Sequence, residues 1–173
     1  LSTADEYVGR LVEVAREADV DIRESIMSLR ATLSEHGLFP TLTQYLAKYE
    51  KYYGIQTRLE GSETFSDGAF DLQVEVQLLR ILQEALTNVR KHANAHSVQI
   101  AFVLENGWAH ITVHDDGRGF DPGMSSTGPE EHVGLRVMHE RVEEMGGSLR
   151  LQSASGQGTE LVVRVPVKGA SHA

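Results

Sequence analysis

The spacing of apolar residues predicts a long amphipathic helix at the start of the chain. Thr3 and Glu6 have the spacing of a capping box, which is typical of a helix N-terminus. Small or apolar residues then recur at alternating three- and four-residue steps, which is the spacing of a heptad seam. These residues are Val8, Leu11, Ala15, Ala18, Ile22, Ser25 and Leu29, and Ile26 and Leu33 widen the stripe. A stripe this wide must be covered, so we expect it to pack on another helix or, alternatively, on the rest of this chain.

The pattern between residues 37 and 93 predicts two further helices and a strand. Gly37 and Pro40 interrupt the first helical pattern. A short helix over 42–53 should then end at Gly54, and a strand over 55–60 should follow it. After a polar loop, a helix is predicted over 71–93; its apolar side consists of Leu78, Leu82, Ala85, Leu86 and Val89.

The second half alternates strands with one helix. Residues 97–104 and 109–113 alternate strictly around Asn106–Gly107, which is typical of a two-residue hairpin turn. A stretch rich in glycine and proline over 116–131 precedes a predicted helix over 133–145 and strands over 148–153 and 159–165. We therefore predict an α+β fold: a two-layer α/β sandwich with a mixed, mostly antiparallel sheet, preceded by one long helix.

Composition narrows the function classes. The 173 residues include 16 Lys and Arg against 25 Asp and Glu, a formal net charge of −9, which argues against nucleic acid and anionic lipid as partners. Without cysteine the chain has no disulfides or thiolate metal sites. No apolar run approaches the roughly 20 residues of a membrane span. We expect a cytoplasmic location without direct membrane contact, and, since the chain lacks an initiator Met, a piece of something longer.

Three polar features carry candidate chemistry, and the first lies on the helix over 71–93. Glu84, Asn88 and Lys91 stand at i, i+4 and i+7, so they share one helix face. A carboxylate, an amide oxygen and an ammonium group in a row suit Mg²⁺ and phosphate groups, because Mg²⁺ prefers hard oxygen ligands. The alternative is an ordinary solvated helix face.

The second feature follows the strand over 109–113. By strand parity Asp115 lies on the apolar inward face, where a carboxylate is costly unless it is paired, for example with a ligand amino group. Asp116 points the other way and ranks lower. Gly117 and Gly119 allow a tight turn and the close approach of a flat ligand. The alternative is a solvated aspartate that leads into a flexible loop.

The third feature is a glycine at a predicted helix start, to which a glycine-rich turn before the last strand is added. Gly134 is expected at the start of a helix, where free N–H groups bind phosphate. Residues 156–158 form a tight turn before the hydroxyl of Thr159, although a plain hairpin turn is the alternative reading. The histidine pairs are a much weaker prediction of a metal site. His92 and His96 have no apparent third ligand, and His110 and His114 would lie about 13 Å apart along their strand.

In this order the features resemble the conserved boxes of sensor histidine kinases. Residues 84–93 (EALTNVRKHA) resemble the N box and residues 115–120 (DDGRGF) the G1 box. Residues 134–141 (GLRVMHER) resemble the shortened G2 box of the NarX-like, nitrate/nitrite sensor branch, and residues 156–159 (GQGT) resemble the closing Gly-x-Gly-Thr box. Residues 23–30 resemble the second helix of that branch's dimerisation and phosphotransfer hairpin.

The resemblance implies a Bergerat ATP-binding fold with ATP and Mg²⁺ as cofactors. Asn88 would hold the Mg²⁺ that bridges the ATP phosphates, and Glu84 would orient that site or a water in it. Lys91 and His92 would lie near the phosphates.

The resemblance also assigns the nucleotide base and the lid. Asp115 would accept a hydrogen bond from the adenine amino group, with Thr159 supporting that network. Residues 117–133 would form the ATP lid, and Gly134 and Leu135 would offer backbone N–H groups to phosphate.

The family's phosphoacceptor histidine lies on the first helix of the hairpin, yet residues 1–35 contain no histidine. Residues 1–36 would then be the second hairpin helix only, and 37–173 the catalytic domain. It would transfer the ATP γ-phosphate to a histidine helix of the parent kinase, a homodimer at full length, for relay to a NarL-type response regulator. A related ATPase or serine kinase of anti-sigma type, and a non-catalytic nucleotide-binding module, stay open as alternatives.

Overall fold

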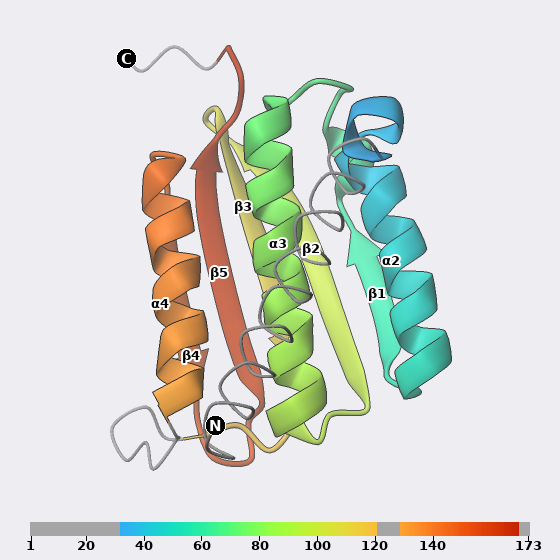
Figure 1. Ribbon diagram of the computed structural model, residues 1–173, viewed down its shortest axis with the longest axis vertical. Coiled ribbons are helices and arrows are strands. Elements are labelled where there is room, and N and C mark those ends of the chain that lie inside the picture. The colour runs from blue at the N-terminus through green and yellow to red at the C-terminus, as the bar shows by residue number, and fades with distance from the viewer. Residues whose placement is uncertain (1–31, 121–128, 170–173) are drawn as a thin grey trace, which may run out of the picture.

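In the part of the chain that the structure describes, a five-stranded sheet carries α-helices on one face (Figure 1) and has no α-helix on its other, uncovered face. This computed structural model describes residues 32–120 and 129–169, with the side chains of 129–133 left out. Residues 32–36 are helical. The rest of the long first helix predicted from the sequence, including its heptad seam, lies outside the described residues.

The sheet has the order β1-β2-β3-β5-β4. Its strands are β1 (Gln56–Glu60), β2 (Ser97–Glu105), β3 (Trp108–Asp115), β4 (Ser148–Ser153) and β5 (Thr159–Pro166). Among these, β1 and β2 are parallel and the three other neighbouring pairs are antiparallel. The predicted two-layer sandwich with a mixed, mostly antiparallel sheet is therefore confirmed.

The first helix of the sandwich, α2 (Leu38–Tyr53), begins four residues earlier than predicted. Pro40 lies in its first turn, where a missing N–H costs nothing because the first N–H groups of a helix have no internal partner. The predicted C-terminal cap is confirmed, since Gly54 adopts the left-handed conformation with φ 69°.

The second helix, α3 (Leu72–Asn88), begins one residue after the predicted start at Asp71 and changes its geometry at the far end. Residues Val89–Ala93 form a π-helical turn, η2, with i→i+5 hydrogen bonds. The Tyr49 hydroxyl donates a 2.9 Å hydrogen bond to the Leu86 carbonyl just before this turn, so α2 is attached to α3 close to the change in geometry.

The third helix, α4 (Pro129–Glu144), also begins four residues earlier than the predicted start at 133. Proline at the first helical position followed by two glutamates is a common helix start, and this signal outweighs the glycine-rich sequence before it. The helix ends at the predicted glycines, Gly146 and Gly147.

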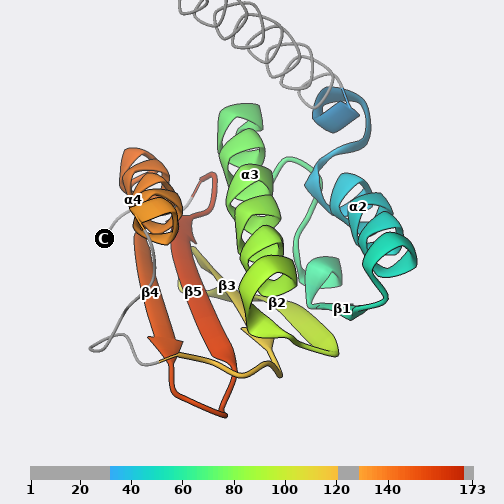
Figure 2. The same ribbon diagram turned by 60° about the horizontal axis from the view of Figure 1, so that its bottom comes forward.

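The core lies between the helices and the inner face of the sheet, which Figure 2 shows from the end of the layers. The predicted alternation of β2 and β3 is confirmed, with one set of side chains buried: Val98, Ile100, Phe102, Ala109, Ile111 and Val113. Leu104 shares this face but is 40% exposed. It lies beyond Ala101, the last β2 residue that pairs with β1.

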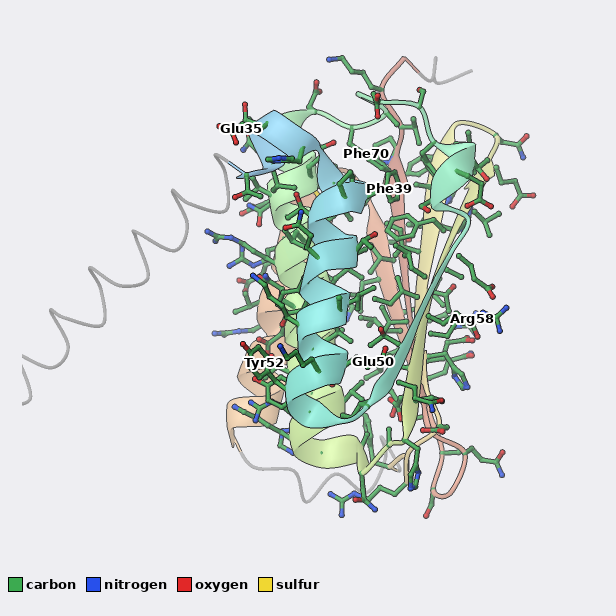
Figure 3. The ribbon with its side chains drawn as sticks, turned by 90° about the vertical axis from the view of Figure 1, so that its right-hand side faces the viewer. Glu35, Phe39, Glu50, Tyr52, Arg58 and Phe70 are labelled. Atoms are coloured by element: carbon green, nitrogen blue, oxygen red, sulfur yellow. The ribbon has the colours of Figure 1, made fainter. Side chains whose placement is uncertain are left out.

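Aromatic side chains fill the end of the core remote from the C-terminus of α3. Phe39 and Phe65 each pack against Phe102, with ring centroids 5.0 and 5.9 Å apart, and Phe65 stacks on Phe70 at 5.7 Å. Figure 3 shows Phe39 and Phe70 between the layers, whereas Arg58 extends from the uncovered face. This packing holds α2 on the sheet.

Leu33, at the end of the predicted first helix, is buried in the same core with 1% of its surface exposed. The chain turns directly afterwards, where the Gly37 N–H donates to the Leu33 carbonyl at 2.8 Å. The last turn of that helix therefore packs on the sandwich, and the proposed boundary between residues 36 and 37 remains a prediction.

Candidate functional site

The predicted polar residues gather at one end of the sandwich, at the bottom of Figure 1, where α3, β3 and β4 end and α4 and β5 begin. Asp115 and Thr159 are register partners on neighbouring strands. The Arg118 N–H donates to the carbonyl of Ala93 at 2.8 Å and joins the segment after β3 to the end of α3. Residues that are far apart in the sequence thus form one site.

Asp115 ends the apolar face of β3 and is only 4% exposed, as strand parity predicts. Its Oδ1 accepts a 2.9 Å hydrogen bond from the Gly117 N–H. Burial raises the pKa of the carboxyl, opposed by backbone hydrogen bonds from Gly117 and Thr159. A buried acceptor of this kind suits a ligand that brings its own hydrogen-bond donor.

Asp116 has a different, structural role. Its Oδ1 accepts from the backbone N–H groups of His96 (2.8 Å) and Ser97 (2.9 Å), and its Oδ2 accepts from the Ser97 hydroxyl at 2.9 Å. Hydrogen bonds from the Ser97 backbone are the largest cause of a lowered pKa for this carboxyl. Asp116 therefore fixes the start of β2, in line with its low rank as a ligand-binding residue.

A third polar side chain, that of Ser153 on β4, lies in line with Asp115 and Thr159 across the sheet and was not predicted from the sequence. Asp115 pairs with Thr159 on β5, and Thr159 pairs with Ser153 on β4. Side chains directly opposite one another lie on the same face of a sheet. The signal was present, because Ser153 extends the period-two pattern of Leu149 and Leu151, but only the strand order places it beside Thr159.

The glycines of this region are required by protein packing. A Cβ atom at Gly117 would lie 2.4 Å from the Ala93 carbonyl oxygen, and one at Gly119 would lie 2.0 Å from that of Ala154. A Cβ atom at Gly158 would lie 2.0 Å from the carbonyl oxygen of Asp115. Contacts within the protein are therefore sufficient to require glycine at Gly117, Gly119 and Gly158, and the predicted approach of a flat ligand at Gly117 and Gly119 stays a prediction.

The structure keeps only part of the polar helix face predicted for Glu84, Asn88 and Lys91. Glu84 and Asn88 lie one α-helical turn apart, and both are partly exposed. Lys91 and His92 lie in the π turn, whose wider winding rotates them away from the line that α-helical spacing predicts. Lys91 is exposed and His92 partly buried, so their position relative to Asn88 differs from the expectation.

Gly134 does not start its helix. It is the sixth residue of α4, so its N–H and that of Leu135 fall within the helical hydrogen-bond ladder rather than among the free groups of the first turn. Gly134 instead lies against Glu84, where an added Cβ atom would be 2.6 Å from Oε1. The expectation of a helix start at Gly134 is therefore wrong for this structure.

The family that the sequence matches agrees with the fold and the site described above. Residues 73–169 match the family described as "Histidine kinase-, DNA gyrase B-, and HSP90-like ATPase". The match covers more than half of the chain and includes each part of the site described above. The chain belongs to this family and carries its ATP-binding domain.

Within this broad family, the chain is similar in sequence to curated histidine kinases. The chain is 35% identical over 160 residues to the sensor histidine kinase LiaS of Bacillus subtilis (strain 168), covering 91% of this chain and 42% of LiaS. It is 30% identical over 158 residues to the signal transduction histidine-protein kinase/phosphatase DegS of Brevibacillus brevis, covering 91% of this chain and 40% of DegS. The chain therefore spans less than half the length of these relatives.

Solved structures share the fold. The blue-light activated histidine kinase of Erythrobacter litoralis EL346 superposes with a TM-score of 0.68 at 19% identity, over 88% of this chain and 50% of that chain. The mycobacterial sensor histidine kinase MprB gives 0.53 at 18% identity, over 72% of this chain and 92% of that chain.

No helix in 32–120 or 129–169 combines the length and the apolar character needed to cross a membrane. In the same ranges, no three His, Asp or Glu side chains are grouped so that they could hold a metal ion.

Proposed function

We propose that this chain is the catalytic, ATP-binding part of a two-component sensor histidine kinase, which transfers the γ-phosphate of ATP to a histidine on a partner helix. The observation that carries the proposal is the joining of two polar groups at one end of the sandwich. The buried carboxylate of Asp115 is linked through Gly117 and Arg118 to the end of α3, which bears Glu84 and Asn88.

Adenine recognition is assigned to Asp115. Its carboxylate is buried and its pKa is raised, so an amino group from a ligand would add a hydrogen bond that the apolar surroundings lack. Thr159 lies beside it in the neighbouring strand. A base edge that reaches Asp115 also reaches the Thr159 hydroxyl, directly or through one water molecule.

Magnesium and the phosphates are assigned to the end of α3. The amide oxygen of Asn88 and the carboxylate of Glu84 are hard oxygen donors, and both residues are partly exposed, which leaves room for the phosphates and waters that Mg²⁺ keeps in its shell. The donor set fits the ion. When bound, Mg²⁺ would neutralise charge on the transferring phosphate, while Asn88 holds the ion and Glu84 orients the site or a water.

Positive charge around the phosphates would come from local side chains, because the chain as a whole is acidic. Lys91, which is exposed in the π turn that follows Asn88, would supply this charge, with His92 next to it in the sequence. For Gly134 and Leu135 to offer N–H groups to phosphate, the first turns of α4 would have to open. We propose that contact only for the nucleotide-bound state.

The partners are proposed from the relatives, whose names describe sensor and signal transduction histidine kinases. Residues 1–36 would be the second hairpin helix of a NarX-like dimerisation segment, and residues 37–173 the catalytic domain. The parent protein would be a homodimer that supplies the phosphoacceptor histidine and relays phosphate to a NarL-type response regulator.

The test begins with nucleotide binding. The purified chain should bind ATP in the presence of Mg²⁺, with Asn88→Ala and Asp115→Asn each weakening binding, as titration calorimetry measures. The chain alone should acquire no acid-labile phosphate from labelled ATP, because residues 1–35 contain no histidine. A supplied histidine-bearing hairpin should acquire it.

Two other outcomes of these experiments would support the alternative functions. Acid-stable phosphate on a serine of a supplied partner would indicate a serine kinase of the same fold. Binding of ATP without transfer to any supplied hairpin would indicate a nucleotide-binding module. The seven-residue apolar spacing of residues 8–29 favours the histidine kinase, since such a seam suits a dimeric helical bundle.

A further inference from the structure

The Ser153 hydroxyl joins three separate parts of the site. It accepts a 2.9 Å hydrogen bond from the Phe120 N–H, donates a 2.9 Å hydrogen bond to the Gly158 carbonyl, and lies 3.1 Å from the Thr159 hydroxyl. Phe120 follows β3, whereas Gly158 and Thr159 lead into β5. One side chain of β4 therefore holds both segments that flank Asp115.

Counting hydrogens fixes the direction of the third contact. A serine hydroxyl has one hydrogen and two lone pairs. A carbonyl oxygen can only accept, so the single hydrogen of Ser153 goes to Gly158. The contact with Thr159 can then form only if Thr159 donates its own hydrogen to Ser153, which fills the remaining lone pair of the Ser153 oxygen.

The consequence concerns what Thr159 can offer a ligand. With its hydrogen held by Ser153, the Thr159 hydroxyl presents only lone pairs, and the neighbouring Asp115 carboxylate is also an acceptor when ionised. The two side chains that meet the base are then both acceptors. Such a pair favours a base edge that carries an amino group and disfavours one that carries a carbonyl oxygen.

We propose that Ser153 is a positioning residue for nucleobase selectivity: it holds the Thr159 hydroxyl as an acceptor, so that the site prefers a 6-amino purine over a 6-oxo purine. The proposal rests on the proposed function, because it takes ATP as the ligand. It differs from the assignment of Asp115 in that Ser153 acts only through Thr159.

The test compares ATP with inosine triphosphate, which carries a 6-oxo group and lacks the 2-amino group of guanine. In Ser153→Ala the Thr159 hydroxyl is released and can turn to donate its hydrogen to the 6-oxo group. The ratio of ATP affinity to inosine triphosphate affinity should fall about three- to tenfold. Ser153→Thr keeps the hydroxyl and should retain the wild-type ratio, while Ser155→Ala, at an exposed position in the same turn, controls for loss of a serine.

The outcomes separate the two proposals. If the wild-type chain does not bind ATP, the proposed function fails. If it binds ATP and Ser153→Ala keeps the wild-type ratio within twofold, the proposed role of Ser153 is overturned, whatever the effect on stability. Should Ser153→Ala not fold, Ser153→Cys preserves the shape with weaker hydrogen bonds, and it must lower the ratio for the proposal to stand.

Discussion

Gly134 on α4 lies directly against the Glu84 carboxylate on α3: a Cβ atom at position 134 would be 2.6 Å from Oε1. The contact joins the predicted phosphate-binding glycine to the residue assigned to the Mg²⁺ site. It gives the glycine a role that needs no free N–H group, namely to leave space for the carboxylate. Only the far end of a flexible side chain would have to move to admit a methyl group.

Gly134→Ala should therefore separate stability from function. Alanine is favoured over glycine in a helix interior by roughly 0.5–1 kcal/mol, so the free energy of unfolding should be unchanged or higher. The displaced Glu84 carboxylate should lower phosphate transfer to a supplied histidine hairpin by about tenfold. Denaturant unfolding and transfer kinetics measure the two effects, with Glu143→Ala at the exposed end of the same helix as control. Unchanged transfer kinetics would show that the contact has no functional role.

Replacing Asp115 or Asp116 by asparagine should have opposite effects on the free energy of unfolding. Burial raises the folded-state pKa of Asp115, so its favourable contribution to stability is present below the ordinary pKa and is lost as pH rises through the folded value. At neutral pH, Asp115→Asn should thus raise the free energy of unfolding, while ATP affinity falls at least about tenfold because a charged acceptor is lost.

Asp116→Asn should do the reverse. The folded-state pKa of Asp116 is lowered, so its stabilisation is present above the ordinary pKa and is lost as pH falls through the folded value. At neutral pH the substitution should cost about 1 kcal/mol, a modest figure because the side chain is exposed. ATP affinity should stay within about threefold of wild type, because the Asp116 side chain bonds to the start of β2 and not to the ligand. Equal effects of the two variants on ATP affinity would contradict the strand-parity argument.

As the pH is lowered, ATP affinity should fall at a higher pH than it would if Asp115 had the pKa of an ordinary aspartate. The ionised carboxylate is a stronger acceptor for the adenine amino group than the neutral acid, and burial raises its pKa above the usual value of 3.8. Affinity should accordingly fall as pH drops through that raised value. Calorimetric titrations across acidic pH on the wild type and Asp115→Asn measure this, and the same midpoint in both would assign the loss to another group.

The Tyr49 hydroxyl should contribute measurably to the attachment of α2 to α3. It donates to the Leu86 carbonyl at 2.9 Å, and desolvation is the main cause that raises its pKa to about 12. Tyr49→Phe should cost about 1 kcal/mol of unfolding free energy, whereas Tyr52→Phe, at a residue 72% exposed, should cost nothing measurable. The neutral hydroxyl is favoured in the fold, so this stabilisation should disappear between about pH 10 and pH 12.

The glycines of the turn before β5 should differ although their backbone conformations match. Gly156 and Gly158 have φ of 76° and 71°. A Cβ atom at 156 would meet nothing within 4 Å, but at 158 it would be 2.0 Å from the Asp115 carbonyl oxygen. Gly156→Ala should cost about 1 kcal/mol from the left-handed conformation alone, and Gly158→Ala clearly more. Similar losses of thermal stability for both would mean that the turn can move away from β3.

Local pattern was sufficient for the parts of this fold that depend on periodicity. Alternation along β2 and β3 predicted which side chains are buried, and hence the position of Asp115. Ser153 could not be placed in the same way, because its neighbour Thr159 is defined by strand order, which is a tertiary property. The π turn after Asn88 leaves no periodic trace in five residues, so the positions of Lys91 and His92 were predicted on α-helical geometry that ends just before them.

The position of β5 has a consequence for how the domain is made. This strand, Thr159–Pro166, is the last of the described strands in sequence, yet it lies between β3 and β4. Until the ribosome has released it, β3 lacks a partner on that side, and Asp115 lacks both Thr159 and the backbone N–H that it supplies. The proposed nucleotide site therefore cannot be completed before residues 159–166 have been synthesised, and a nascent chain that stops before residue 159 leaves the edges of β3 and β4 that pair with β5 unpaired, which favours aggregation.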